Sequence, residues 1–448
     1  MAIFLNNRGK IAESGFEARN LALTLLIEIE EQSAYANLVV PSRLRDSSLE
    51  VRDKAFVTEL VYGTLRRQLF YDRVIERSAN RSLSKVDSIP LQILRLTAHQ
   101  LLTLSTPAHA AVDSAVRLTV KNKHGSASGF VNAVSRRISE RTLDEWISLL
   151  ATGGDEVDRL SIKYAHPKWI VEAYLARLGN IEQVEVELAA NNVNPKTTGV
   201  IYPGNEWSTE TLSTSEPGRW VAAARYLVGN PELLPEIRNA IAGIQDEGSY
   251  LVAQALAVVS TSANGIWLDM CAGPGGKAAL LSRWATLNHR KFLALELSEH
   301  RAALITRVSD AVVVADASRP PMPPNSAAKI LLDAPCSGLG ALRRRPDARL
   351  RKELSQITNL VQLQRRLFTA AVETLAVGGV LAYVTCSPLI DETIGNTKWA
   401  TEQFSEIELI DARPYFPDEM HQAGNFDIQL WPGLHQTDAM YVAMFRKR

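Results

Sequence analysis

Residues 265–282, GIWLDMCAGPGGKAALLS, decide the fold of the C-terminal half of the chain. A short apolar run ends at Asp269, a turn rich in glycine follows, and helical spacing of apolar residues begins after it. Glycine at such a turn lets the backbone come close to a ligand at the helix N-terminus. Alone the turn is a weak indication, since it is neither GxGxxG nor a GxxxxGK followed by Ser or Thr.

The same alternation of short apolar runs and helical stretches continues over residues 241–448. The further runs are KFLALEL, AVVVAD, KILLDAP and GVLAYVTC. Such alternation predicts a Rossmann-like α/β domain with a parallel sheet and crossover helices. Because ligands of these sheets bind at the carboxyl ends of the strands, the residues directly after each run are the candidates for a site.

Acidic residues stand at the ends of three successive predicted strands. Glu296 follows the second strand, 20 residues after Gly276, and a carboxylate at that distance commonly binds ribose hydroxyls. Asp316 follows the third strand and can accept a hydrogen bond from an adenine amino group. Each acid alone reads equally well as a helix N-cap or a surface carboxylate. Their register on successive strands, together with Asp269, favours a nucleoside ligand.

All three cysteines, Cys271, Cys336 and Cys386, also fall at predicted strand ends. Their spacing suits neither a disulfide framework nor a zinc site, so we expect no metal. Cysteine is more often a small buried apolar residue than a nucleophile, and we interpret Cys271 in that way. Cys336 and Cys386 are the candidates for chemistry.

Thiols at such a site suit methylation of a pyrimidine. Carbon 5 is a poor nucleophile, but a thiolate added at carbon 6 activates it toward a methyl-sulfonium group; a base then removes the carbon 5 proton and the thiol is eliminated. The thiolate needs a nearby cation, which Lys277 can supply. Asp333 can accept from the cytosine amino group or bind a protonated ring nitrogen, which favours cytosine over uracil. The base must leave any helical stack to be reached.

Residues 1–145 predict an all-helical domain with one core. Apolar residues recur at helical spacing, strand patterns are absent, and breaks are expected at Pro41, Pro90 and Pro107 and at Gly125 and Gly129. Residues 146–240 predict a small α+β linker module, with TTGVIYP and WVAAARYLV as candidate strands.

Composition is that of a globular protein, with 46% hydrophobic and 22% charged residues in a chain of 448. No apolar run suggests a membrane span and the N-terminus shows no secretion signal, so we expect a monomer in the cytoplasm without membrane partners.

Net charge is zero, yet residues 1–145 hold 20 Lys and Arg against 16 Asp and Glu, and residues 331–370 hold 8 against 3. This distribution is compatible with nucleic-acid binding. Solvated helix faces explain the N-terminal excess equally well. The arginines after the fourth strand either hold an RNA backbone or begin a solvated helix; they are Arg343, Arg344, Arg345, Arg349 and Arg351.

Three segments of residues 241–448 resemble the signature motifs of the NOP2/Sun (Fmu) family of RNA 5-methylcytosine methyltransferases. They are LDMCAGPGGK at 268–277, DAPCSGLGALRRRPD at 333–347 and YVTCS at 383–387. AGIQDEGSYLVAQAL at 242–256 is similar to the segment that precedes the cofactor motif in that family.

The helical part resembles a NusB-like RNA-binding domain. The resemblance rests on RDKAFVTELVYGTLRR at 52–67, PAHAAV at 107–112 and FVNAVSRR at 130–137. This order of domains is similar to that of bacterial members acting on small-subunit ribosomal RNA, so RNA is the implied partner.

The family resemblance implies a Rossmann-like methyltransferase domain at 241–448 with S-adenosyl-L-methionine as methyl donor. It implies that Cys386 is the nucleophile and that Cys336 assists release of the methylated RNA. Asp333 would lie between cofactor and target base. The implied cofactor-binding residues are Cys271, Ala272, Gly273, Pro274, Gly275, Gly276, Lys277, Glu296, Asp316 and Asp333.

The chain departs from the family pattern at three places. Glu296 stands where the family more commonly has Asp, a change that ribose binding tolerates. The usual Pro-Glu-Glu-Asn after the nucleophile is replaced by Pro388-Leu-Ile and then Asp391-Glu392-Thr393. A usual Asp-Gly-Phe-Phe appears as Asp438-Ala-Met-Tyr441. We therefore expect the contacts that support the site to differ.

Other functions fit some of the same residues. A transfer RNA is an alternative substrate for the same chemistry. A non-catalytic RNA-binding factor in ribosome assembly is an alternative function, and it would tolerate loss of Cys386. A NAD-linked dehydrogenase is disfavoured, because the GxGxxG turn is missing and two strand-end cysteines would have no purpose.

Overall fold

A computed structural model describes residues 2–32, 35–422 and 424–448, and the chain divides into two compact units. The first unit contains Met1–Glu172 together with Arg344–Arg351, and the second contains Ala173–Arg343 together with Lys352–Arg448.

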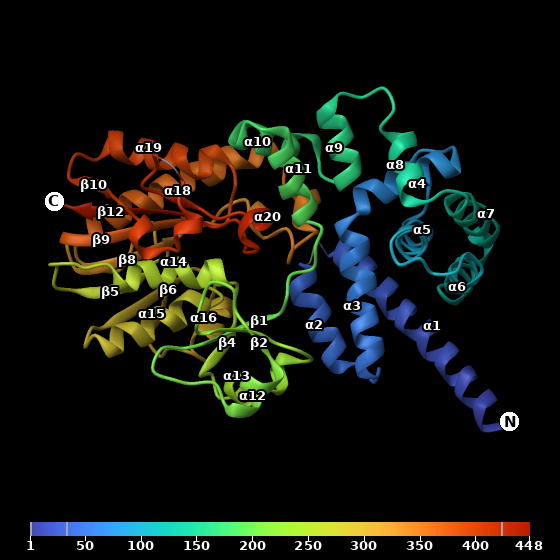
Figure 1. Cartoon of the computed structure of the whole chain (residues 1–448), viewed down its shortest axis with the longest axis horizontal. Coiled ribbons are helices and arrows are strands. Elements are labelled where there is room, and N and C mark those ends of the chain that lie inside the picture. Colours follow the sequence, from blue (N-terminus) through green and yellow to red (C-terminus); the bar gives the residue numbers. More distant parts are fainter. Residues whose placement is uncertain (1, 33–34, 423) are drawn as a thin grey trace. The chain divides into compact units, whose positions relative to one another are not determined.

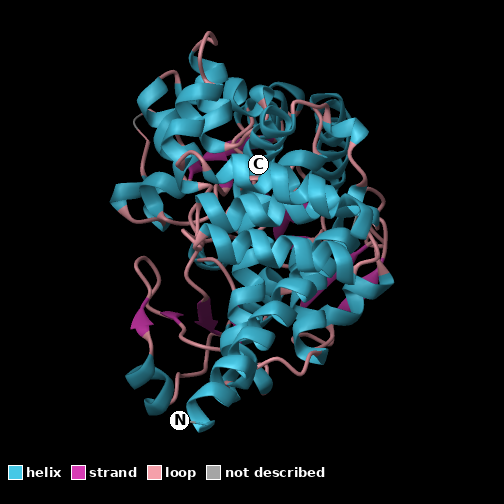
Figure 2. Cartoon of the chain, turned by 90° about the vertical axis from the view of Figure 1, so that its right-hand side faces the viewer, coloured by secondary structure: helices cyan, strands magenta, loops and turns pink. Residues whose placement is uncertain are grey.

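The first unit is helical throughout its described residues (Figures 1 and 2). Its α-helices are α1 (Ala2–Glu31), α2 (Ala36–Asp46), α3 (Val51–Arg66), α4 (Gln68–Ala79), α5 (Ser88–Leu102), α6 (Ala108–Lys121), α7 (Ser128–Ser139), α8 (Leu143–Leu150), α9 (Glu156–Tyr164) and α17 (Ala348–Arg351). Helix α5 is buried on nearly every side, and its buried Arg95 is paired with Asp72 and Glu30, as a buried charge requires. The expected all-helical domain is confirmed.

Three of the expected breaks are wrong. Pro41 lies inside α2, and Pro90 lies in the first turn of α5, where a helix has no N–H bond for proline to remove. Gly129 likewise lies inside α7, whereas Pro107 directly precedes α6. The tertiary contacts of α2 and α7 therefore override the local preference of these residues.

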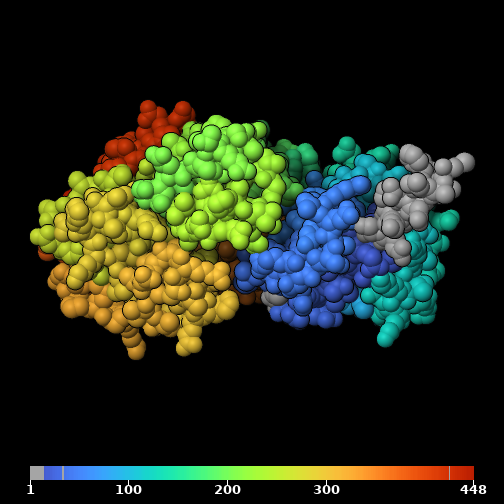
Figure 3. Space-filling view, turned by 90° about the horizontal axis from the view of Figure 1, so that it is seen from below, coloured from blue at the N-terminus to red at the C-terminus, as the bar shows by residue number. Residues whose placement is uncertain are grey.

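A four-stranded antiparallel sheet opens the second unit, with strand order β2-β3-β1-β4. Its strands are β1 (Thr198–Ile201), β2 (Glu216–Pro217), β3 (Ala224–Tyr226) and β4 (Ala242–Ile244). Helices α10 (Lys168–Leu178) and α11 (Ile181–Ala190) precede this sheet in the chain, and α12 (Thr209–Thr214) and α13 (Pro235–Arg238) lie between its strands in sequence. Both candidate strands of this region are confirmed. Figure 3 shows this part, in green, as a lobe on one face of the unit.

The large sheet has the order β10-β12-β9-β8-β5-β6-β7, and β11 pairs with β12. Its strands are β5 (Ile266–Asp269), β6 (Phe292–Glu296), β7 (Val312–Val314), β8 (Ala327–Asp333), β9 (Leu375–Thr385), β10 (Ile407–Ile410), β11 (Ile428–Gln429) and β12 (Tyr441–Lys447). The five predicted strands, β5 to β9, pair in parallel as expected. Strand β12 adds antiparallel to β9, and β10 adds antiparallel to β12.

Helices cover both faces of this sheet (Figure 1). One face packs against α14 (Glu247–Val258), α15 (Gly276–Leu287) and α16 (Glu299–Ile305). The other face packs against α18 (Leu354–Thr374) and α19 (Ile394–Gln403). A short helix, α20 (Pro432–His435), precedes β12. Strands buried on both faces read as continuous apolar runs, which explains the sequence patterns of β8 and β9.

Candidate active site

The glycine turn between β5 and α15 is built around Glu296 at the end of β6. Glu296 Oε2 accepts a hydrogen bond from Gly273 N at 2.9 Å, and its Oε1 accepts from Ser298 N at 3.0 Å. A Cβ atom on Gly273 would collide with Glu296 Oε2, and Gly275 has a φ of 117° that side chains rarely permit. These glycines therefore let the turn close onto a buried acid.

Asp269, the last residue of β5, is buried beneath the turn. Its Oδ1 accepts from Cys271 N at 3.3 Å. Among the described residues, neither its Oδ2 nor Gln245 Oε1, which lies close to Gly276, has a hydrogen-bond partner. Burial, and next the charge of Asp333, raise the pKa of Asp269 to about 8. The turn thus presents acceptor atoms that a ligand with several donors would satisfy.

We expect Asp269→Asn to stabilise the ligand-free protein in alkaline solution. The pKa of Asp269 is about 8 in the folded protein and 3.8 in the unfolded chain. Between these two pH values the folded protein retains a proton that the unfolded chain releases. The free energy of unfolding therefore falls as pH rises from about 4 to 8. A neutral isostere removes this loss. The Tm should rise by about 3–6 °C at pH 8.5 and by less at pH 5.5. Calorimetry at both pH values, with the exposed Asp310→Asn as control, checks this; an equal gain at both would contradict it.

Lys277 and Asp333 form an ion pair across the carboxyl ends of neighbouring strands. Lys277 Nζ lies 2.7 Å from Asp333 Oδ2. Burial lowers the pKa of Lys277, but the charge and hydrogen bond of Asp333 outweigh burial, so that the pKa is raised overall; the charge of Cys386 contributes in the same direction. The first turn of α15 therefore holds a fixed positive charge close to Cys386.

The thiols of Cys336 and Cys386 meet at the ends of β8 and β9, with their sulfur atoms 3.4 Å apart. The hydrogen bond with Cys386, burial and the charge of Cys386 raise the pKa of the Cys336 thiol well above its ordinary value. Burial, and next the charge of Asp269, raise the pKa of the Cys271 thiol, in keeping with its interpretation as a packing residue.

Gly340 ties the two cysteine loops together. Its N–H donates to Cys386 O at 2.9 Å, and its carbonyl accepts from Ala439 N at 2.8 Å. An added Cβ would lie 2.8 Å from the Cys386 carbonyl carbon, so only glycine fits. Asp438 N in turn donates to Asp246 Oδ1 at 3.0 Å. The segment Asp438-Ala-Met-Tyr441 therefore contacts the cysteine loops through the backbone N–H of Ala439.

Asp316 is exposed, and its Oδ1 accepts from Ser318 N at 2.9 Å. That hydrogen bond lowers its pKa. It follows β7, which is separated from β5 by β6 in the sheet. The structure thus brings Lys277, Asp333 and the two thiols into a connected group and places Glu296 against the turn, whereas the carboxylate of Asp316 is engaged in its own loop.

Two arginines expected to hold RNA or to begin a solvated helix do neither. Arg349 is 0% exposed and its Nη1 donates to Arg66 O at 2.9 Å and Ala165 O at 3.2 Å, both within the helical unit. Arg343 is 6% exposed and lies 3.5 Å from Asp246 and 3.4 Å from Asp438. A buried guanidinium cannot reach a phosphate, so the prediction is wrong for both residues.

Glu392, which the motif comparison marks only as part of a departure, lies beside both cysteine loops. Glu392 is fully buried and accepts hydrogen bonds from Ser337 and Ser387, the residues that follow the two cysteines. The one available signal was a pair of adjacent acids, Asp391 and Glu392, close after Cys386, and the sequence does not say which of the two is buried.

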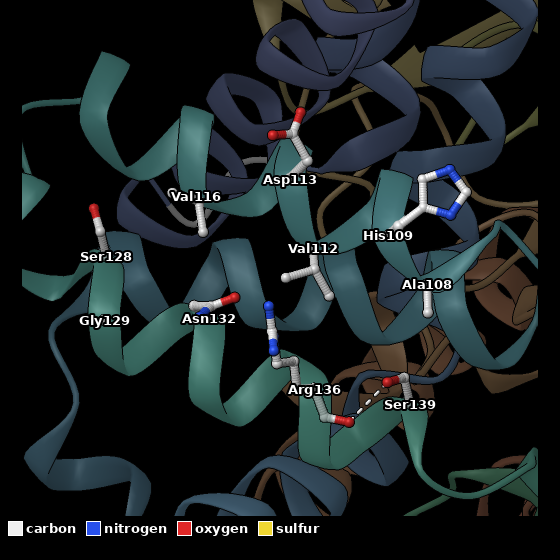
Figure 4. Close-up of a pocket in the computed structure, with 10 residues that line it drawn as sticks. All are labelled: Ala108, His109, Val112, Asp113, Val116, Ser128, Gly129, Asn132, Arg136 and Ser139. Carbon is white, nitrogen blue, oxygen red and sulfur yellow. Dashed lines mark hydrogen bonds between the residues drawn. The ribbon is translucent and has the colours of Figure 1, made fainter.

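A hollow of about 750 Å³ lies apart from this site, between α6 and α7 of the helical unit. Figure 4 shows Arg136 and Asn132 of α7 extending into it toward Val112 of α6. Residues 108–141, which contain α6 and α7, carry six Lys and Arg against two Asp and Glu, and Arg136 is the one of these basic residues that lines the hollow.

Within the described ranges, no cluster of three His, Cys, Asp or Glu side chains could hold a metal ion. No helix in those ranges is sufficiently long and apolar to span a lipid bilayer.

The strand order, the glycine turn after β5 and the acid after β6 define the class of S-adenosylmethionine-dependent methyltransferases. The family described as 16S rRNA methyltransferase RsmB/F matches residues 256–446, and the NusB family matches residues 17–140. The chain belongs to the RsmB/F family and carries an N-terminal NusB domain.

Relatives match along nearly the whole chain. A Mycobacterium tuberculosis protein named as a methyltransferase is 38% identical over 442 residues, covering 96% of each chain. Ribosomal RNA small subunit methyltransferase B of Pseudomonas putida is 31% identical, covering 84% of this chain and 86% of its own. The crystal structure of PH0851 shares the fold, with a TM-score of 0.78 at 21% identity over 97% of this chain and 98% of that one.

Proposed function

We propose that this protein methylates carbon 5 of a cytosine in RNA, in small-subunit (16S) ribosomal RNA, through a covalent adduct between Cys386 and carbon 6. The observation that carries the proposal is the pair of thiols 3.4 Å apart beside the Lys277–Asp333 ion pair. A methyltransferase that acts on an already nucleophilic nitrogen or oxygen has no need of two thiols at its catalytic strand ends.

The residues around the glycine turn fit S-adenosyl-L-methionine. Its ribose hydroxyls and amino groups are hydrogen-bond donors. Glu296 suits them, because each of its oxygens can accept a further bond beside the one from the backbone. The unpartnered oxygens of Asp269 and Gln245 suit them as well. Its carboxylate suits the N-terminus of α15. Asp316 is proposed to bind the adenine, and no metal is required. When bound, the cofactor supplies an electrophilic methyl group.

The chain's own residues would prepare the cytosine. Lys277 stabilises the Cys386 thiolate, which forms a sulfur–carbon bond at carbon 6. Asp333 accepts from the amino group and stabilises the positive charge that develops on the ring as carbon 5 becomes nucleophilic. After carbon 5 is methylated, its proton leaves to a base, the electron pair re-forms the ring double bond, and the Cys386–carbon 6 bond breaks. Cys336 assists this release.

An RNA substrate is supported by the helical domain and by the relatives. Arg136 can donate hydrogen bonds to a phosphate, and Asn132 can donate to a base edge. The segment that contains α6 and α7 also carries the excess of basic residues within residues 1–145. The Pseudomonas putida relative is named for small-subunit ribosomal RNA. We therefore propose that the NusB domain positions this RNA.

The test is transfer from radiolabelled S-adenosylmethionine to unmodified 16S ribosomal RNA, followed by nucleoside analysis. We expect the label in 5-methylcytosine, and little transfer to unmodified transfer RNA. Label in 5-methylcytosine of transfer RNA alone would keep the chemistry and change the substrate. Label in any other nucleoside would refute the proposed chemistry. RNA binding without transfer to either RNA would favour a non-catalytic assembly factor.

A further inference from the structure

Behind the two cysteines lies a buried carboxylate that the proposed reaction does not use. Glu392 Oε1 accepts from Ser337 N at 2.8 Å, and its Oε2 accepts from Ser337 Oγ at 2.5 Å and Ser387 Oγ at 2.6 Å. Ser337 directly follows Cys336, and Ser387 directly follows Cys386. One side chain therefore fixes the backbone beyond both thiols.

Three further elements hold Glu392 in place. Gln364 Nε2 of α18 donates both to Glu392 Oε1 at 3.0 Å and to Pro335 O at 2.9 Å. Tyr383 OH of β9 donates to the Glu392 carbonyl at 2.8 Å, and Asn396 Nδ2 of α19 donates to Tyr383 OH at 2.9 Å. The carboxylate is thus satisfied by several donors, as a buried charge requires.

The charges around the two sulfur atoms are unequal. Glu392 and Asp333 both contribute to the raised pKa of Cys336, after its bond with Cys386 and its burial. The positive Lys277 interacts with Cys386. Arg365 lies on the far side of the network, where its Nε donates to Asn396 Oδ1 at 3.1 Å. Glu392 makes two hydrogen bonds to Ser337, which follows Cys336, and one to Ser387, which follows Cys386. Its negative charge is therefore held more closely to the Cys336 loop, whereas Lys277 contributes a positive charge at Cys386.

We propose that Glu392 is a positioning residue that holds both cysteine loops in one arrangement and makes their thiols unequal, so that Cys386 alone serves as nucleophile. The inference rests on the proposed function for its purpose, but not for its geometry. The two thiols are chemically identical and lie 3.4 Å apart, so a neighbouring group must determine which of them is the nucleophile. We assign that role to Glu392.

Alkylation tests the proposal without RNA or methyl donor, so its result is independent of the proposed reaction. The full chain is treated with iodoacetamide at pH 7.5, where a thiolate displaces iodide, and labelling of each cysteine is followed by peptide mass spectrometry. In the wild type we expect Cys386 to react at least about tenfold faster than Cys336. In Glu392→Gln that ratio should fall about fivefold or more, because Cys336 loses its negative neighbour.

Two further variants keep the test decisive. Glu402→Gln, an exposed position on α19, should keep the wild-type ratio. Ser337→Ala removes a donor to Glu392 but leaves the carboxylate less screened, so the ratio should rise. A merely structural Glu392 would loosen the loops in both Glu392→Gln and Ser337→Ala and shift the ratio in one direction. That result, or an unchanged ratio in folded Glu392→Gln, would overturn the proposal; if Glu392→Gln does not fold, the direction of the Ser337→Ala shift decides.

Discussion

Replacing Cys386 by alanine is expected to lower the rate of methyl transfer by at least about 10⁴-fold, or about 5.5 kcal/mol of transition-state stabilisation. Without the thiolate, carbon 5 of the cytosine is not activated, and the neighbouring sulfur cannot substitute because the pKa of Cys336 is raised well above its ordinary value. Single-turnover transfer of a radiolabelled methyl group to 16S ribosomal RNA measures this loss directly.

Cys271→Ala is the matched control for this prediction. Cys271 also follows a strand of the same sheet, but burial and Asp269 raise its pKa, and it packs against the core. We expect its variant to retain activity within about fivefold, since the hydrogen bond of Cys271 in the cofactor turn is made by its backbone N–H, which alanine keeps. RNA affinity should be unchanged in both variants. Activity of Cys386→Ala within tenfold of the wild type would exclude Cys386 as the nucleophile.

The parts of this site that the sequence predicts are those encoded by local pattern. Apolar runs that end in Asp269, Glu296 and Asp333 place these acids at the carboxyl ends of parallel strands, because the strand pattern and its direction together determine that edge. The proximity of Cys336 to Cys386 follows from the pairing of β8 with β9. The glycines of the turn indicate a close backbone approach, which Glu296 explains.

The parts that the sequence does not predict depend on distant contacts. Arg349 reads as a surface arginine in a basic run, yet carbonyl oxygens from the ends of α3 and α9 surround it. Glu392 reads as a loop acid, yet donors from both cysteine loops converge on it. Strand β12 pairs antiparallel with β9, although more than 50 residues separate the two strands in the sequence. No local sequence pattern indicates such a distant pairing.

Replacing Cys336 by alanine is expected to have the opposite phenotype to loss of Cys386. Cys386 can still add to carbon 6 and carbon 5 can still be methylated, but release slows because the sulfur 3.4 Å away no longer assists it. We expect a protein–RNA adduct that survives denaturing electrophoresis and turnover reduced by about 10²–10³-fold, the usual contribution of a general acid–base group. The wild type should show no more than a trace of adduct.

The double variant Cys336→Ala/Cys386→Ala separates this explanation from others. It should form no adduct, because the bond to RNA requires the sulfur of Cys386 whatever occupies position 336. Adduct in the double variant would point to another nucleophile, and its absence from Cys336→Ala would leave Cys336 without a role in release. Two neighbouring sulfur atoms in one packing environment cannot produce opposite effects through packing alone. Trapping by loss of one and inactivation by loss of the other would therefore follow from their separate positions in the reaction, first formation and then cleavage of a single carbon–sulfur bond.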